Sequence, residues 1–465
     1  MRTDHRLGPV FAVVAAGVAM SNLDVFIVNV ALPEIGTHFG GASLASLSWI
    51  LNAYAVVFAA LMVPAGGFAD RTSPRRAYLL GLTVFTAASV ACALAPGVWT
   101  LVAARVVQAA GAAVLIPSSL GLLLAAAPPE RRMAAVRGWT AIGGVAAALG
   151  PVVGGALTDL DWRWVFLVNV PIGIAAIVAG LKLLPRTPAK EETPRADLLG
   201  AAALTAGVAS LSLGVVKSSD WGWTSAEVIG SLVAALVLLA WFVTRSARHP
   251  SPVLPPALLR VRGFGPATLA SVLFAVAFAG MVLSSVLWCQ EVWHWSALRT
   301  GLAIAPGPLM VPALAVGAAP IARRFGAGPL AIAGCAFFAG GIAWWTWRIE
   351  DGYAAGMLPG MLLTGIGVGL TLPTLVGAAV TAVPPQNFST GSGVVTMARQ
   401  VGMVLGIAVL VAVLGDRPDA AAFDAGWVAT LTATAAVAVV CLFLPRPRPV
   451  PAPTTGPPRQ PAAQA

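Results

Sequence analysis

The sequence predicts an all-helical membrane protein that crosses the bilayer many times, and three observations carry that prediction. Hydrophobic residues make up 58% of the 465 residues and charged residues only 10%, whereas soluble proteins carry about 25% charged residues. The mean hydropathy is +0.86. Apolar runs of about 20 residues, enough to span a bilayer, recur along the chain. Because lipid admits only helices or closed barrels, runs of this length predict transmembrane helices.

We expect fourteen transmembrane helices, and the placement of charge and tryptophan supports that number. The expected centres lie near residues 20, 56, 86, 112, 147, 174, 207, 235, 276, 310, 338, 365, 401 and 435. With a cytoplasmic N-terminus, 21 of the 28 Lys and Arg fall in inside segments, Arg137 among them, and 5 in outside loops. This positive-inside bias predicts a multi-pass protein of the inner cell membrane with both termini cytoplasmic. All of the 15 Trp except Trp139 and Trp241 lie at predicted outer helix ends, at the interface that Trp prefers.

Composition and residue spacing argue against several classes of function. The net charge of +10 orients the chain and meets anionic lipid, so it does not indicate a nucleic-acid partner. The 4 Cys have no metal-binding or redox spacing and the 4 His are scattered, so we expect no metal site, no catalytic residues and no cofactor. The sequence shows no phosphate-binding loop, which argues against ATP as the energy source. A membrane enzyme such as an acyltransferase, or a non-transporting sensor, is therefore disfavoured.

An internal repeat divides the chain into two similar halves. The stretch AAGAAVLIPSSLGLLLAAAPPE (109–130) aligns with GIGVGLTLPTLVGAAVTAVPPQ (365–386) at a constant offset of 256 residues, with Gly111 matching Gly367 and Pro117 matching Pro373. Two parallel six-helix halves with the site between them are a transporter arrangement. The expected parts are an N-terminal half (1–184), a linker with two extra transmembrane helices (185–262), a C-terminal half (263–445) and a disordered cytoplasmic tail (446–465).

Four further stretches carry a specific resemblance. They are GGFADRTSPRR (66–76), LVAARVVQAAGAA (101–113), GPVVGG (150–155), and WRWVFLVNVPIG (162–173) taken together with SNLDVFIVNVALP (21–33). Together they resemble the major facilitator superfamily, and within it the fourteen-helix drug/proton antiporters. The resemblance implies the superfamily fold and, from 150–155, export rather than import.

The resemblance also implies roles for individual residues. The loop at 66–76 would latch the halves on the cytoplasmic side, although Ser73 and Pro74 depart from the family pattern. Arg105 and Gln108 share one helix face and would line the central cavity, as would Tyr54. The small residues at 150–155 would give a thin, kinkable face. The expected latch residues are Gly66, Asp70, Arg71 and Arg75, and the expected antiporter-motif residues are Gly150, Pro151, Gly154 and Gly155.

Asp24 is the only acid of the 18 that lies well inside an expected span. Asp24 and Arg105 lie roughly 12 and 9 Å below the outer surface, at 1.5 Å per residue, so we expect them to pair. Burial favours a protonated acid and a nearby Arg favours the carboxylate. The balance would let Asp24 load and unload a proton, because acids within the membrane are functional by default.

Arg399 is the other charge inside a span, and the sequence leaves open whether it contacts substrate or packs the two halves together. We predict a monomeric proton-coupled exporter of small amphipathic compounds such as drugs or antibiotics, driven by the proton gradient. The remaining alternative is a proton-coupled symporter or importer on the same fold. One membrane carboxylate against two arginines favours neutral or weakly ionised substrates over dicationic ones.

Overall fold

The computed structural model describes residues 4–40, 44–158, 160–185, 197–295, 297–414 and 420–445. The expected tail at 446–465 therefore lies outside the described residues. Helices account for nearly all of the described chain, and within it thirteen helical stretches are long and apolar enough to cross a membrane. The 27-residue helix α5 occupies the position of the remaining expected span. The fold is the all-helical bundle that the sequence predicts.

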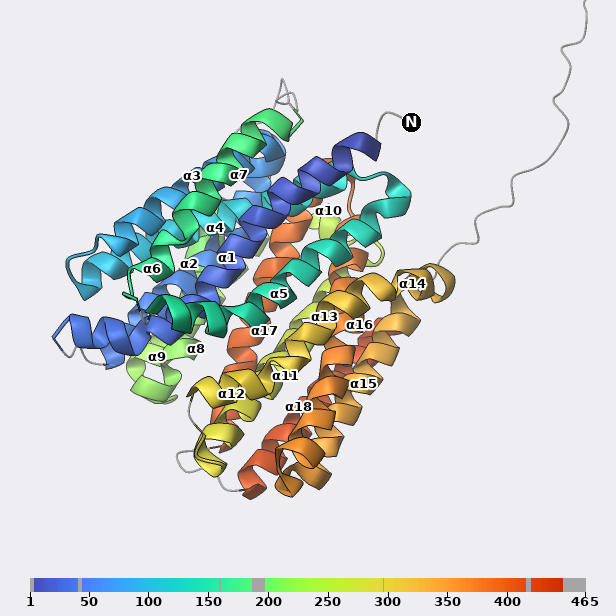
Figure 1. Ribbon diagram of the computed structural model, residues 1–465. Helices are drawn as coiled ribbons and strands as arrows, with labels where there is room; N and C mark the ends of the chain where they lie inside the picture. Colours follow the sequence, from blue (N-terminus) through green and yellow to red (C-terminus); the bar gives the residue numbers. More distant parts are fainter. Residues whose placement is uncertain are drawn as a thin grey trace, which may run out of the picture.

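The helices alternate in direction, so their ends gather at two faces (Figure 1). We call the face at which α1 begins the N-terminal face. The first half contains α1 (Asp4–His38), α2 (Leu44–Arg71), α3 (Pro74–Ala93), α4 (Val98–Ala126), α5 (Arg132–Thr158), α6 (Trp164–Leu167) and α7 (Asn169–Leu183). The second contains α11 (Phe264–Leu287), α12 (Ala297–Ile304), α13 (Pro306–Gly317), α14 (Ala319–Phe325), α15 (Ala327–Arg348), α16 (Leu358–Ala382), α17 (Phe388–Leu414) and α18 (Ala420–Cys441).

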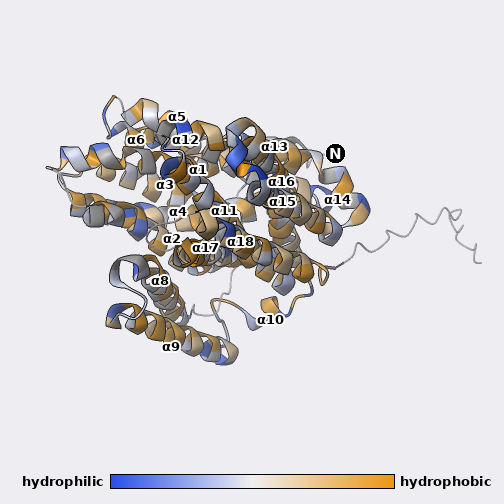
Figure 2. Ribbon diagram, turned by 90° about the horizontal axis from the view of Figure 1, so that it is seen from below, coloured by the Kyte–Doolittle hydropathy of each residue, from blue (hydrophilic) through white to orange (hydrophobic). Residues whose placement is uncertain are grey.

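Two additional helices, α8 (Leu198–Trp221) and α9 (Ala226–Arg248), form a hairpin at the side of the bundle, as Figure 2 shows. The short helix α10 (Pro256–Leu259) leads from this hairpin to the second half. Helix α8 packs against α2 and α17, so the hairpin contacts both halves. Much of α9 faces outward, with Leu236 and Val237 exposed, as expected for a helix against lipid.

The internal repeat has a direct structural counterpart in the packing of paired helices. A Cβ at Gly111 of α4 would lie 2.7 Å from the backbone nitrogen of Phe85 and 3.0 Å from the carbonyl oxygen of Gly81. A Cβ at Gly367 of α16 would lie 2.6 Å from the backbone nitrogen of Phe338. Gly111 and Gly367 therefore let α4 approach α3, and α16 approach α15, in the same manner. Small residues permit this backbone contact in membrane bundles.

The structure differs from the sequence-based expectation in two places. The span expected near residue 310 is present at Arg299–Gly317, but it is interrupted between α12 and α13, where Pro306 occupies the first turn of α13, and the short helix α14 follows it. Arg137, which we counted among the inside loop charges, instead lies within α5 and is completely buried. Its guanidinium donates to the Ala315 carbonyl at 3.1 Å and to Thr374 Oγ1 at 3.3 Å. Helix α5 begins at Arg132, so Arg137 lies more than one turn inside it.

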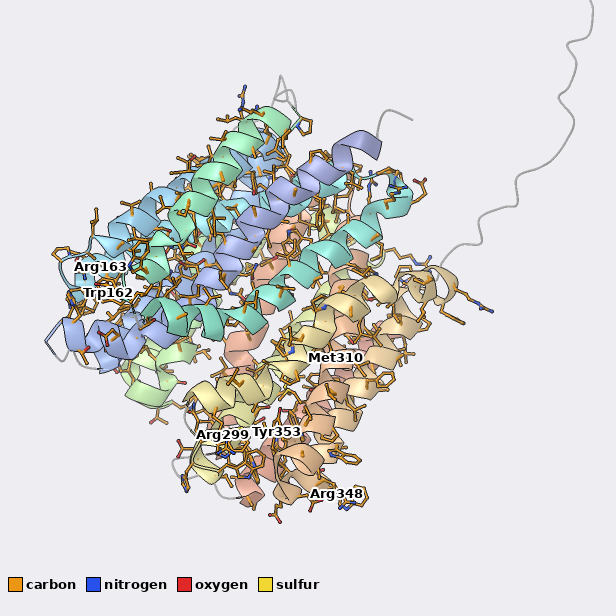
Figure 3. All side chains as sticks on the ribbon, viewed as in Figure 1. Trp162, Arg163, Arg299, Met310, Arg348 and Tyr353 are labelled. Atoms are coloured by element: carbon orange, nitrogen blue, oxygen red, sulfur yellow. The ribbon has the colours of Figure 1, made fainter. Side chains whose placement is uncertain are left out.

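At the face opposite the N-terminal face, aromatic side chains lie beside a few arginines, among them Arg163 and Arg299 (Figure 3). Arg163 lies 4.7 Å from the ring centre of Trp162, and Arg299 lies 4.0 Å from that of Trp295. Trp295 in turn packs against Tyr353. Amphipathic rings of this kind are enriched where a bilayer meets water, so this face fits a membrane interface.

Candidate functional site

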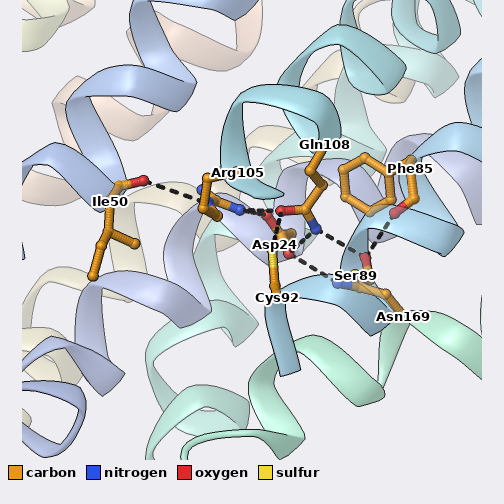
Figure 4. Close-up of polar contacts among 8 residues, drawn as sticks. All are labelled: Asp24, Ile50, Phe85, Ser89, Cys92, Arg105, Gln108 and Asn169. Atoms are coloured by element: carbon orange, nitrogen blue, oxygen red, sulfur yellow. Dashed lines mark hydrogen bonds and ion pairs between the residues drawn. The ribbon is translucent and has the colours of Figure 1, made fainter. Parts of the chain in front are cut away.

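Asp24 and Arg105 form a buried ion pair in the first half, at the centre of the polar cluster in Figure 4. Arg105 Nη1 donates to Asp24 Oδ2 at 2.5 Å, and the two side chains are 1% and 0% exposed. Asp24 comes from α1 and Arg105 from α4, so the pair joins two helices. The proximity expected from their similar depth is confirmed. Each charge compensates the other, which a low-dielectric interior requires.

Amide side chains complete the coordination of the carboxylate. Asp24 Oδ1 accepts from Gln108 Nε2 at 2.9 Å and from Asn169 Nδ2 at 2.8 Å. Gln108 Oε1 accepts from Arg105 Nη1 at 2.6 Å, and Gln108 Nε2 also donates to Ser89 Oγ at 2.9 Å. Gln108 therefore bridges both charges, because it lies one turn from Arg105 on the same face of α4. Hydrogen bonds to the charged form stabilise a carboxylate.

Helix α2 also contacts the guanidinium of Arg105. The guanidinium lies 4.1 Å from the ring centre of Tyr54, a cation–π contact, and Arg105 Nε donates to the Ile50 carbonyl at 3.3 Å. Five helices of the first half thus contribute to one network: α1, α2, α3, α4 and α7. Asp24, Tyr54, Arg105 and Gln108, which we expected around one cavity, are brought together, and all four are buried in this conformation.

Sequence reasoning missed Asn169 and Ser89 as members of this cluster. Asn169 lies inside the quoted stretch WRWVFLVNVPIG, and a lone amide in an apolar run was the available signal. Ser89 carried no signal, because a serine within a helix commonly bonds its own backbone. Ser89 Oγ does so here, donating to the Phe85 carbonyl at 2.9 Å.

Asp70 caps the start of a helix from the other half. Its two carboxylate oxygens accept the backbone N–H of Ser389 at 3.1 Å and of Thr390 at 2.6 Å. These two residues lie in the first turn of α17, where N–H groups have no partner within the helix and the helix dipole attracts a negative charge. A Cβ at Gly66 would lie 2.5 Å from the Ser389 carbonyl oxygen. Gly66 and Asp70 therefore join the halves at the N-terminal face.

The two arginines expected to support the latch bind other groups. Arg71 Nη2 donates to the carbonyls of Ser251 and Pro252, at 3.1 Å each, and so holds the segment that follows α9. Arg75 Nη2 donates to the Leu181 carbonyl at 2.8 Å, within the first half. The departure at Ser73 is accommodated, because its φ of −170° is extended backbone that needs no glycine.

The 150–155 stretch lies in α5. A Cβ at Gly150 would collide with the side chain of Phe26 in α1, whereas Gly155 has no atom within 4 Å of that position. Gly154 is buried. The side chain of Pro151 lies outside the described residues. Close helix packing therefore occurs at the start of this motif and not at its end.

Arg399 stands apart from the cluster, in the middle of α17 in the second half. Its side chain is partly buried. Within the described chain no ion pair to Arg399 is present. Ser389, Ser392, Thr396 and Arg399 lie on one face of α17, because they recur every three or four residues. This face packs against the first half, where Ser389 lies beside Gly66 and Gly121.

Comparison with known families gives one clear result. The family profile described as Major Facilitator Superfamily matches residues 14–200 and 198–407. The methylenomycin A resistance protein of Streptomyces coelicolor is 32% identical over 90% of this chain and 88% of its own length. The cephamycin export protein of Amycolatopsis lactamdurans is 36% identical over 84% of this chain and 82% of its own. The multidrug resistance protein Stp of Mycobacterium tuberculosis is 34% identical over 86% and 74%.

Solved structures show the same architecture at much lower identity. The human organic anion transporter MFSD10 aligns with a TM-score of 0.68 and 14% identity, covering 94% of this chain and 99% of that one. The proton:xylose symporter XylE aligns with a TM-score of 0.64 and 13% identity, over 96% and 97%. At such identities the likeness concerns the fold alone.

Proposed function

This chain belongs to the major facilitator superfamily, as a membrane transporter related to antibiotic and multidrug export proteins, and we propose that it is a proton-coupled exporter of small amphipathic compounds. Antibiotics and other drugs are the proposed cargo. In this proposal the two halves rock around a central site and expose it alternately to the two sides of the membrane. The observation that carries the proposal is the Asp24–Arg105 pair, a titratable group buried inside a transporter half.

Asp24 is the proposed site of proton binding. A proton on Asp24 removes the negative charge that Arg105 pairs with, so the guanidinium must find another partner or move. Gln108 contacts both residues and would transmit that rearrangement along α4. Proton binding would thereby change the packing of α4 against its neighbours, which gives a physical route from titration to conformational change.

Gly66 and Asp70 are the proposed latch for the state in which the N-terminal face is closed. Both hydrogen bonds that the Asp70 carboxylate accepts come from the second half. Opening of the N-terminal face must therefore break them. We propose that the N-terminal face is cytoplasmic, because most of the basic residues lie there. The structure then corresponds to a state closed toward the cytoplasm.

Arg399 is the proposed substrate contact in the second half. Asp24 pairs with Arg105 and neutralises it. Arg399 has no carboxylate partner among the described residues. An uncompensated charge in a membrane interior is expensive, so a substrate with a partial or full negative charge would be favoured. This extends the preference for neutral or weakly ionised compounds over dicationic ones.

Two measurements test the proposed function. Growth inhibition of a pump-deficient host, with and without expression, would identify exported compounds from a panel of neutral, anionic and cationic drugs. Purified protein in liposomes that contain a trapped pH dye should then release protons when an identified compound is added. Substrate movement without proton movement would contradict the coupling.

The competing function is a proton-coupled symporter, and the fold cannot decide between the two because XylE shares it. The direction in which substrate moves relative to protons distinguishes an antiporter from a symporter. An antiporter accumulates substrate in vesicles whose interior is acid, whereas a symporter accumulates it when the exterior is acid.

A further inference from the structure

A basic pocket lies at the end of α9, away from the transport site. Its volume is about 330 Å³, and the residues that line it are Trp241, Thr244, Arg245, Arg248, His249 and Pro250. Among the described residues, the lining contains two guanidinium groups and no carboxylate. The pocket therefore suits an anionic group, and arginine binds phosphate oxygens with several donors at once.

The position of the pocket along α9 matches a bilayer surface. The apolar span of this helix runs from Ala226 to Arg248, and its outward side chains include Val233 at 53% and Leu236 at 70% exposure. Trp241 is 44% exposed and lies in the last turns of the helix. Tryptophan at such a position marks the boundary between hydrocarbon and headgroups. An exposed apolar helix face thus leads directly into the basic pocket.

The two arginines of the pocket are held differently. Arg245 Nε pairs with Asp197 Oδ1 at 2.7 Å, and Asp197 is fully buried beneath it. Asp197 also accepts the backbone N–H of Gly200, so the carboxylate is fixed and it orients Arg245. Arg248 makes no ion pair or hydrogen bond within the described residues and is exposed. Among the described residues, the guanidinium of Arg245 is therefore held in place by Asp197, and that of Arg248 has no hydrogen-bonding partner.

We propose that this pocket binds the headgroup of an anionic phospholipid. The phosphate would sit between Arg245 and Arg248, and the acyl chains would lie along the exposed apolar side of α9. Basic pockets beside transmembrane helices bind anionic lipid headgroups in this way. An inorganic phosphate would use the same donors but would leave the apolar side of α9 without a role.

The segment that leaves the pocket connects it to the latch. After His249 the chain reaches Ser251 and Pro252, whose carbonyls accept both hydrogen bonds of Arg71. Val253 is buried, and its carbonyl oxygen lies 3.5 Å from a Cβ position at Gly67. Arg71 directly follows Asp70 in the sequence. A lipid that fixes this segment would therefore stabilise the closed N-terminal face.

Lipid binding is measured on the delipidated full-length protein, without transport. Native mass spectrometry with phosphatidylglycerol should show bound lipid, and phosphatidylcholine should bind more weakly. Arg248→Gln should weaken phosphatidylglycerol binding about fivefold, the usual effect of one basic charge near a membrane surface. Arg260→Gln, an exposed arginine outside the pocket, is the matched control and should bind like the wild type. Equal binding by the two variants would overturn the proposal, and so would equally effective competition by inorganic phosphate.

The link to the latch has its own readout. The four native cysteines are buried, so a cysteine introduced at Ser392, a buried position on α17, would report opening between the halves. Labelling in nanodiscs should be several-fold slower with phosphatidylglycerol than with phosphatidylcholine. Arg248→Gln should remove that difference and Arg260→Gln should keep it. Identical labelling in both lipids would overturn the coupling to the latch.

Discussion

Arg137 of the first half donates a hydrogen bond to the backbone carbonyl of Ala315 in the second half, over 3.1 Å. The same guanidinium reaches Thr374 Oγ1, so one side chain of α5 bridges to both α13 and α16. These contacts join the two halves, as the hydrogen bonds of Asp70 do, but they involve α5, α13 and α16 instead of α2 and α17. The closed face is therefore held by polar contacts on both sides of the bundle.

Arg137→Gln should favour opening of the N-terminal face. Glutamine is too short to reach both acceptors, and each lost hydrogen bond from a charged donor is worth about 1.5–3 kcal/mol. Labelling of the cysteine at position 392 should accelerate at least tenfold. Arg137→Lys, which keeps a charged donor, should show a smaller effect. Unchanged labelling in Arg137→Gln would mean that this bridge does not hold the face closed.

Asp70→Asn should act on the same equilibrium through the α17 terminus. The amide keeps one acceptor but loses the charge, and a charge at a helix N-terminus is worth about 0.3–1 kcal/mol, or up to about 2 when partly buried. We expect a several-fold rise in labelling at position 392, together with reduced transport. Arg75→Gln is the control, because Arg75 bonds within the first half. Equal labelling of the two variants would contradict a latch at Asp70.

Asp24 and Arg105 should behave as a coupled unit in stability and transport. Arg105→Gln leaves a buried carboxylate without its cation, which costs about 3–5 kcal/mol. Adding Asp24→Asn removes that carboxylate, so the double variant should be more stable than Arg105→Gln alone. Asp24→Asn alone and Asp24→Asn combined with Arg105→Gln should both lose transport driven by a pH gradient while reaching the membrane in normal amounts. Additive losses in a double-mutant cycle would show that the two residues act independently.

Gly111→Ala and Gly367→Ala should destabilise the protein to a similar degree. Each added methyl group meets backbone of the partner helix, and overpacking of this kind typically costs about 1–3 kcal/mol. Gly340→Ala is the control, because no atom lies within 4 Å of its Cβ position. Thermal unfolding in detergent compares the three variants. A loss confined to one of the first two would show that the halves do not share this packing.

The lowered pKa of Asp197 predicts how the stability of the protein depends on pH. Burial tends to raise the pKa of this carboxyl group, but its bonds from the Gly200 N–H and from Arg245 outweigh burial, and the net pKa is lowered. A lowered folded-state pKa stabilises the protein above the unfolded value of about 3.9, and this contribution is lost as pH falls through the folded value. Asp197→Asn should therefore lower Tm at pH 7, and its difference from the wild type should shrink below about pH 4. A constant difference down to pH 3 would contradict this.

The sequence predicted the helices and the central ion pair because both depend on strong signals. Long apolar runs leave few alternatives to a helix in lipid, and two opposite charges buried at similar depth must compensate each other. Asn169 and Arg137 escaped prediction for opposite reasons. A neutral amide carries no charge to balance, and an arginine close to a helix start looks like a loop charge until the helix boundary is known. The acceptors of Asp70 were also hidden, since backbone N–H groups have no sequence signature.

Within the described part of the chain, the hydrogen-bonding partners of Asp24 belong to the first half of the molecule, whereas Arg399 belongs to the second. Under the proposed function, proton binding and substrate binding would then lie in separate halves, which share the internal repeat. On this proposal, substitutions around Arg399 should change the range of exported compounds and leave proton coupling at Asp24 intact. On the same proposal, chimaeras that exchange second halves between relatives should export the range of compounds of the protein that donated the second half.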